Sequence, residues 1–230
     1  SGDYNNLEIQ SSNMTLTLNS NVVVNNLNIN NSNVSIDSSG YYIQINNGAS
    51  FLNSTINCID FIINGNSNIT FNNTTVDASN SVNITGTNSL DFINSQIFSN
   101  INFFSNHVHI DVQSIISSSG FGKSLVGRGE DVGSNRSADG ASHGGYGNVG
   151  YNSGSSQSDI SNTYGSAFEP ITSGSIGGSA QNTGNAGGGG TIKIFANIQL
   201  INNGSISSNG FNGINGYNYR GGGGGSGGSI

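Results

Sequence analysis

The sequence is poor in charge, with one cysteine, one proline, one methionine and no tryptophan. Charged residues make up 7% of its 230 residues, against roughly a quarter in an ordinary soluble domain. Five Lys and Arg residues cannot neutralise a run of phosphates, which argues against nucleic acid as a partner. No apolar run is long enough for a membrane span. Because Cys58 is alone, no intrachain disulfide can hold the fold, and we expect this thiol to be a small buried apolar side chain.

Asn, Ser and Gly dominate the sequence, with 40, 39 and 36 copies. These residues disfavour helix interiors and favour turns. Ile occurs 27 times and Phe 11 times, whereas Leu occurs 8 times, and this excess of β-branched and aromatic residues favours strands. A disordered chain would usually have fewer aliphatic residues and more charge. The composition therefore predicts an all-β protein with almost no helix.

Apolar residues recur in sets at relative positions 0, +2 and +7, and starts at residues 49, 69, 90 and 108 are 20, 21 and 18 residues apart. Another alternating apolar pair precedes each set. The sets are Val22/Val24/Ile29, Ala49/Phe51/Ile56, Ile69/Phe71/Val76, Leu90/Phe92/Ile97, Val108/Ile110/Ile115, and Ile198/Leu200 with Ser205 or Ile206. The preceding pairs are Leu16/Leu18, Ile43/Ile45, Phe61/Ile63, Val82/Ile84, Ile101/Phe103 and Ile192/Ile194.

Each repeat holds three short strands separated by Asn-rich turns, whereas a hairpin meander has longer strands joined by Asn-Gly or Asp-Gly. We therefore predict a single-stranded parallel β-helix, a solenoid with about 20 residues per coil. Its coils would pair about 4.8 Å apart and stack their inward side chains. Asn suits the corners because it tolerates left-handed backbone angles and pairs with its stacked copies. The crossover rule favours a right-handed coil, and a β-sandwich is the main alternative.

The two halves of the chain differ in composition. Residues 1–119 contain 5 of the 36 Gly and no Lys or Arg, whereas residues 120–230 contain the other 31 Gly and all five basic residues. We expect β-helix coils over 1–119, a Gly/Ser/Tyr-rich excursion over 120–190, and a returning coil with a Gly-rich C-terminal segment over 191–230, all in one continuous solenoid. Loops as long as this excursion are usually functional or disordered.

The glycine-rich half contains several short motifs in a fixed order. They are Ala138 to Gly147, Tyr164-Gly165-Ser166 with Glu169-Pro170, Gly174 to Gly178, Gly187 to Gly190 leading into Thr191 to Ile194, Asn203 to Ile206 with Asn209-Gly210, and Gly221 to Ile230. This arrangement resembles large glycine-rich secreted and cell-surface proteins of plants and protists that carry pectin-lyase-like parallel β-helix modules. The resemblance covers residues 120–230, implies an extracellular or cell-surface location, and brings no catalytic residues with it.

Acceptor patterns for N-linked glycans (Asn-x-Ser/Thr) are frequent. Each is a weak signal in a chain so rich in Asn, Ser and Thr, but together they offer a source of solubility for a secreted protein with little charge. We expect several to be occupied, although not the adjacent Asn72 and Asn73 together. The acceptors are Asn13, Asn30, Asn33, Asn53, Asn68, Asn72, Asn73, Asn83, Asn135 and Asn203.

The repeat also predicts an outward column at position +1. Asp91 and His109 would be neighbours in it on adjacent coils, close enough to hydrogen-bond. They are the candidate general acid and base of a polysaccharide lyase or hydrolase, although we favour a solvated polar ladder as the explanation for both. A lyase also needs a cation, and the first 122 residues have no Lys or Arg. The predicted column is Ser50, Thr70, Asp91, His109 and Gln199.

A charged cluster in the excursion comprises Arg128, Glu130, Asp131, Arg136, Asp139 and His143. We favour ion pairs that pin the loop as its role, with a metal site as the alternative. Its carboxylates Glu130, Asp131 and Asp139 could bind Ca²⁺, or could pair with Arg128 and Arg136 and pin the loop. The spacing matches no dedicated metal motif. Dispersed tyrosines could stack on sugar rings, although such residues are common in proteins that bind no sugar. These tyrosines are Tyr41, Tyr42, Tyr146, Tyr151, Tyr217 and Tyr219.

Neither end of the sequence shows the helix or charged cap that covers the unpaired backbone of a terminal coil. A start at Ser1 without an apolar signal region predicts a processed or trimmed product. The end coil would then be completed by a longer β-helical chain or by another copy, and head-to-tail contacts of this kind generate fibres.

These observations predict a secreted structural glycoprotein, a β-helical subunit of an extracellular filament, coat or surface appendage. We expect no catalytic activity and no cofactor apart from N-linked glycans, with Ca²⁺ as an open alternative. A polysaccharide-binding or adhesion module is one alternative. A polysaccharide lyase or hydrolase of pectin-lyase-like type is another.

Overall fold

The computed structural model describes residues 3–37, 43–129, 137–144, 147, 163–166, 168–180, 184–214 and 221–230. The chain forms two compact units. Unit 1 comprises Ser1–Ser117 and Lys193–Ile206, and unit 2 comprises Ser118–Ile192 and Ser207–Ile230. Residues 207–230 thus belong to the same unit as the glycine-rich segment, and the expected continuous solenoid stays a prediction.

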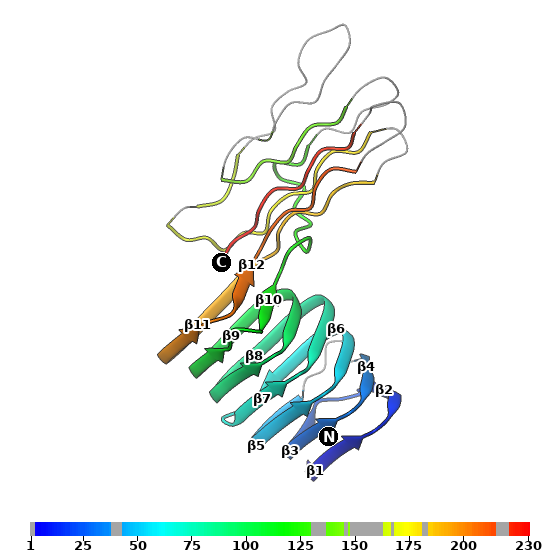
Figure 1. Cartoon of the computed structure of the whole chain (residues 1–230), viewed down its shortest axis with the longest axis vertical. Coiled ribbons are helices and arrows are strands. Elements are labelled where there is room, and N and C mark those ends of the chain that lie inside the picture. The colour runs from blue at the N-terminus through cyan, green and yellow to red at the C-terminus, as the bar shows by residue number, and fades with distance from the viewer. Residues whose placement is uncertain are drawn as a thin grey trace, which may run out of the picture. The chain divides into compact units, whose positions relative to one another are not determined.

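Unit 1 is a parallel β-solenoid of about five turns with about 21 residues per turn, and Figure 1 shows its strands stacked in chain order. The described residues contain strands and no helix, which confirms the predicted fold class. The strands are β1 (Asp3–Gln10), β2 (Asn13–Thr17), β3 (Val22–Asn30), β4 (Asn33–Asp37), β5 (Ile43–Leu52), β6 (Thr55–Asn64), β7 (Asn68–Asn72), β8 (Thr75–Ile93), β9 (Gln96–Ile110), β10 (Ile115–Ser117), β11 (Ile192–Asn202) and β12 (Ser205–Ser207).

Strand pairing divides each turn into three walls, which explains why long strands such as β8 and β9 bend through more than one wall. Equivalent residues of successive turns pair in parallel, so each wall is a ladder along the solenoid axis. The first wall comprises residues 6–10, 26–30, 48–52, 68–72, 89–93 and 107–110. The second comprises 13–17, 33–36, 55–58, 75–78, 96–98 and 115–117. The third comprises 22–24, 43–45, 60–64, 81–85 and 100–104.

Apolar side chains alternate into the solenoid and stack turn upon turn. Phe71 is 0% exposed and lies between Phe51, at a centroid distance of 4.6 Å, and Phe92, at 5.2 Å. Phe103 continues the stack beyond Phe92 at 5.3 Å. A single turn could not bury these rings, so the core exists only because the turns stack.

The corner between the first and second walls is built from Asn followed by Ser or Thr. The backbone at Asn31, Asn53, Asn73 and Asn94 has a φ of 46° to 49°, the left-handed region that Asn tolerates. The Asn53 amide donates to the Asn31 side-chain oxygen at 3.1 Å, and that of Asn73 donates to Asn53 at 2.9 Å. The predicted role of Asn at the corners is thus confirmed.

The residue after each corner Asn points inward and closes the backbone. The Ser95 hydroxyl accepts from the Thr74 amide at 3.1 Å and donates to the Ile93 carbonyl at 2.8 Å. Ser114 accepts in the same way from the Ser95 amide at 3.0 Å. These buried hydroxyls satisfy backbone groups that the turn would otherwise leave unpaired.

Two details of the predicted register are wrong. Val22 and Val24 pair with Ile43 and Ile45 in the third wall, so they do not share a wall with the later sets. Ile116 instead of Ile115 is fully buried, because the corner before it is one residue longer than the corner before Ile97.

Unit 2 has a core made of backbone. Its glycine-rich segments (green, yellow and red in Figure 1) are joined by backbone hydrogen bonds such as Gly174 N–H to Gly189 O at 2.7 Å. A Cβ added at Gly177 would overlap the carbonyl of Gly223. Close-packed glycines also recur three residues apart, a spacing typical of the extended polyproline II conformation, which makes no hydrogen bonds within its own segment. Such pairs are Gly174/Gly177, Gly210/Gly213 and, at the C-terminal end, Gly225 with the equally crowded Gly228.

Candidate functional site

The predicted outward column exists on the first wall. Pairing places Ser50 beside Thr70, Thr70 beside Asp91, and Asp91 beside His109. Gln199 does not follow from the same register. One turn earlier, the Asp111 amide donates to the Phe92 carbonyl, and Asp91 is then the partner of His109. The Asn203 amide donates to the Ile110 carbonyl at 2.8 Å in the same way. By the same offset, Ile201 lies over His109.

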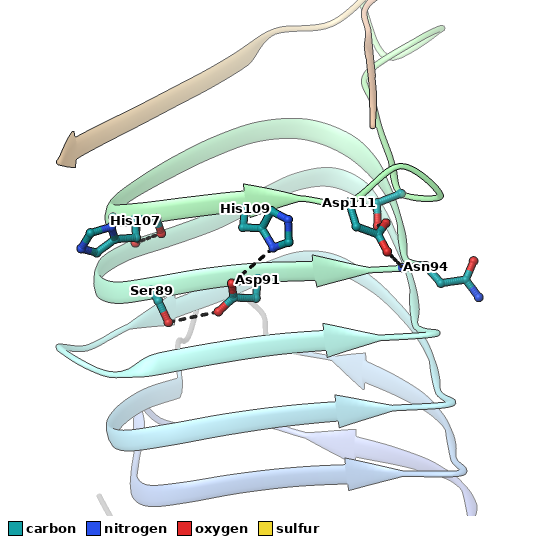
Figure 2. A network of polar contacts seen from close by, with 8 residues as sticks. Ser89, Asp91, Asn94, His107, His109 and Asp111 are labelled. Atoms are coloured by element: carbon teal, nitrogen blue, oxygen red, sulfur yellow. Dashed lines mark hydrogen bonds and ion pairs between the residues drawn. The ribbon is translucent and has the colours of Figure 1, made fainter. Parts of the chain in front are cut away.

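Asp91 and His109 face each other across adjacent strands β8 and β9 (Figure 2). His109 Nδ1 lies 3.8 Å from Asp91 Oδ1, and the two side chains are 39% and 34% exposed. Both project from rigid strands, so their separation is set by the rung spacing. At this distance the pair is an ion pair when His109 is protonated, beyond the 3.2 Å limit of a good hydrogen bond.

Ser89 and His107 extend the cluster along the same two strands. Ser89 pairs with His107, and its hydroxyl donates to Asp91 Oδ2 at 3.2 Å (Figure 2). The carboxylate therefore stands between the hydroxyl and the imidazole. In the Ser-His-Asp arrangement the serine hydroxyl bonds to the imidazole, with the carboxylate behind it, whereas here the Ser89 hydroxyl bonds to the carboxylate. The alternation of these four residues at i and i+2 was visible in the sequence and could have added Ser89 and His107 to the predicted pair.

Asp111 serves the backbone at the next corner. Burial raises the pKa of Asp111, but hydrogen bonds from the Ser114 hydroxyl and from the amides of Asn94, Gln113 and Ser114 outweigh burial and hold the pKa below its ordinary value. The Ser114 hydroxyl lies 2.6 Å from Asp111 Oδ1, and the Asn94 amide 3.0 Å from Oδ2 (Figure 2). The carboxylate thus takes the place of a backbone carbonyl, because at the previous corner the Asn73 amide donates to the Ile93 carbonyl of the next turn.

The candidate metal residues are only partly placed. Glu130 and Asp131 lie outside the described residues, as does Arg136, whereas Asp139 is 3% exposed in unit 2. Within the described ranges, no three His, Cys, Asp or Glu side chains come close enough to hold a metal ion. The Ca²⁺ site therefore stays a prediction.

The glycan acceptors fall into different surroundings. Asn13, Asn33, Asn53, Asn68, Asn73 and Asn203 are exposed, whereas Asn30, Asn72 and Asn83 are half-buried; Asn135 lies outside the described residues. The side-chain nitrogens of Asn53 and Asn73, the atoms that would carry a glycan, donate within the corner ladder.

The tyrosines proposed to stack on sugars all lie outside the described residues: Tyr41, Tyr42, Tyr146, Tyr151, Tyr217 and Tyr219. Tyr164 is described, and its hydroxyl donates to the Ser173 carbonyl at 2.6 Å. Its ring lies 4.8 Å from the His143 ring, and His143 Nε2 is 2.8 Å from the Thr172 hydroxyl. This aromatic side chain is therefore used inside unit 2.

Cys58 occupies an inward-facing position of the second wall, between Ile36 and Ala78. Burial, with smaller contributions from Asp60 and Asp77, raises the pKa of the thiol to about 12. The thiol is thus protonated at neutral pH and behaves as the small apolar side chain that the sequence predicted.

Comparisons of the chain with protein-family models, curated proteins and solved structures gave no match. In the part of the chain that the structure describes, no helix has the length and apolarity required to cross a membrane. Its function is therefore inferred from the fold and from the geometry of its side chains.

Proposed function

We propose that this protein is a structural subunit of an extracellular filament, coat or surface appendage, in which β-solenoids associate end to end. The observation that carries the proposal is the stacking of the turns in unit 1, because inward side chains such as Phe71 are buried only between the turns on either side. Among the described residues, β1 pairs only with β3 and β2 only with β4. One side of each strand therefore has backbone groups that can pair with another parallel strand.

Core-facing positions at this end are also exposed. Tyr4 pairs with Val24 and is 55% exposed, and Met14 pairs with Val34 and is 36% exposed, whereas both valines are fully buried. The difference arises because the valines are covered by a turn on each side. A second solenoid stacked on this end would bury Tyr4 and Met14 and extend the backbone ladder.

The extracellular setting is supported by the exposed glycan acceptors and by the scarcity of charge. Asn-rich outer walls are well solvated, and glycans would add to their solubility. The Ser89 hydroxyl bonds to a carboxylate in place of an imidazole, and Asp111 caps a corner of the solenoid. These two arrangements support a role without catalysis.

Negative-stain microscopy and sedimentation velocity over a range of protein concentrations test the proposal. We expect concentration-dependent oligomers or filaments from the wild type at physiological salt. Met14→Lys places a charge in the end face and should abolish them. Ser50→Lys, on the outer first wall in the middle of the solenoid, is the matched control and should assemble normally. Monomers alone at every concentration, or assembly unaffected by Met14→Lys, would contradict end-to-end association.

A further inference from the structure

An exposed aromatic pair lies on the outside of unit 1. Phe104 in β9 and Phe195 in β11 stack with ring centroids 4.9 Å apart and an interplanar angle of 4°. They are 42% and 48% exposed, whereas the inward stack of Phe51, Phe71 and Phe92 is fully buried. Below Phe104 the same outward column continues as Thr85 and Asn64. In this last part of the column, aromatic rings thus stand where the earlier turns have polar side chains. The rings point outward and contribute nothing to the core.

Polar side chains flank the rings on the same face. Along β11, Lys193, Phe195 and Asn197 are exposed, whereas the intervening Ile194 and Ala196 are half-buried. Strand alternation therefore points all three outward, about 6.6 Å apart. The Asn197 amide also donates to the Asn106 side-chain oxygen at 3.1 Å, which adds a pair of amides beside the rings.

The charge of Lys193 is isolated on this wall. It is the only Lys or Arg of unit 1. Asp60 is the nearest acidic residue along the third wall, and it pairs through Ser81 with Asn100, in the turn below β11. Three rungs put it roughly 14 Å away, beyond the Debye length of about 8 Å at physiological salt. Within the described part of unit 1, an anion that approaches this wall thus meets the Lys193 ammonium with no carboxylate close enough to compete.

We propose that Lys193, Phe195 and Asn197 form a binding subsite for a carboxylated sugar, a hexuronate unit of an acidic polysaccharide. The electron-rich face of an aromatic ring attracts the polarised C–H groups on the apolar face of a pyranose. Phe104 covers one face of Phe195 and holds the ring in place, so the ligand stacks on the other. The Lys193 ammonium pairs with the sugar carboxylate. The amides of Asn197 and Asn106 donate to and accept from hydroxyls.

The simpler role for the aromatic pair is to attach β11 to β9. That role explains the contact between the rings but gives no function to the isolated Lys193 or to the amides beside it. The two roles differ in a measurable way, because a purely structural pair would leave the protein indifferent to sugars.

Calorimetric titration of the full chain with two oligosaccharides tests the subsite. The probes are a β-1,4-linked mannuronate hexamer and the corresponding mannose hexamer, which differ in the carboxylate at C6. We expect tighter binding of the mannuronate. Lys193→Gln should weaken mannuronate binding about fivefold and remove the preference, and Phe195→Leu should weaken both ligands about fivefold. Raising the salt concentration should reduce the preference.

Two matched controls exist in unit 2. Lys123→Gln removes another exposed cation, and Phe168→Leu removes a ring that is 101% exposed; neither should change binding. Because Lys193 is exposed, Lys193→Gln is informative even if Phe195→Leu loosens the last turn. The inference is overturned if mannuronate does not bind, if the controls weaken binding equally, or if only an amphipathic peptide binds the rings. Met14→Lys should retain sugar binding, which separates this subsite from end-to-end association.

Discussion

The inward phenylalanine stack gives the sharpest prediction about stability. Removing a buried phenylalanine side chain usually costs about 3–5 kcal/mol. Phe71 has stacked neighbours at 4.6 and 5.2 Å and an edge contact with Phe61 at 6.3 Å, and such pairs add about 0.5–1.5 kcal/mol each. Backbone ladders hold the adjacent turns at a fixed spacing, so the cavity cannot collapse. We therefore expect Phe71→Ala to cost about 5 kcal/mol.

Urea unfolding followed by far-UV circular dichroism measures this loss. Phe98→Ala is the control, because Phe98 is half-buried on the outer face of the second wall and should cost about 1 kcal/mol or less. Since solenoids need not unfold in one step, hydrogen exchange should show the protection falling first in β5, β7 and β8, the strands around the cavity. Equal losses from both variants would refute the assignment of the inward stack as the core.

Four further predictions follow from individual residues. Asn53→Ala should cost about 2 kcal/mol in urea unfolding and Asn53→Gly about 1 kcal/mol, because glycine loses the ladder bonds but keeps the left-handed backbone; equal costs would contradict this division. The depressed pKa of Asp111 stabilises the fold above the unfolded-state pKa, and this contribution is lost as the pH falls through the folded-state pKa. The stability advantage of the wild type over Asp111→Asn at pH 7 should therefore shrink below about pH 4; a gap independent of pH would exclude the charge as its cause. Native Cys58 should react with iodoacetamide at pH 8 about a thousandfold more slowly than in urea, and equal rates would show an accessible thiolate. Gly177→Ala should destabilise unit 2 by more than about 2 kcal/mol and lower its melting temperature. Gly144→Ala, with open space around its Cβ, should leave the melting temperature unchanged.

The solenoid could be predicted because two independent sequence signals mark its repeat. The spacing of Phe51, Phe71 and Phe92 gives the length of a turn, and the dipeptides at Asn53 and Asn73 mark where each turn bends. Both signals depend only on local chemistry: alternation along a strand, and the tolerance of Asn for positive φ.

The errors in register have an equally local cause. Val22 and Val24 alternate just as the first-wall residues do, and alternation alone does not say which wall a strand belongs to. The extra residue in the corner before Ile116 is invisible as well, because Val112 and Gln113 resemble any turn. Only the pairing of the assembled ladder distinguishes these cases.

Unit 2 was harder to predict because its packing uses no apolar pattern. Sequence reasoning looks for hydrophobic periodicity, and the segments around Gly174 and Gly210 have almost none. Their order comes from backbone packed on backbone, where a side chain at Gly177 would not fit. The three-residue spacing of the crowded glycines was the available signal, although neighbouring glycines in the same segments obscure it.

The distribution of charge follows from these two ways of packing and bears on how copies meet. Unit 1 carries seven Asp and Glu residues against Lys193 alone, and the described acidic side chains point outward from the walls or their corners. Two solenoids side by side would therefore face each other with like charges. The end of the first turn presents backbone N–H and C=O groups with Tyr4 and Met14 exposed. Electrostatics thus disfavours lateral contact and leaves the solenoid axis as the direction in which a second copy gains both hydrogen bonds and apolar burial.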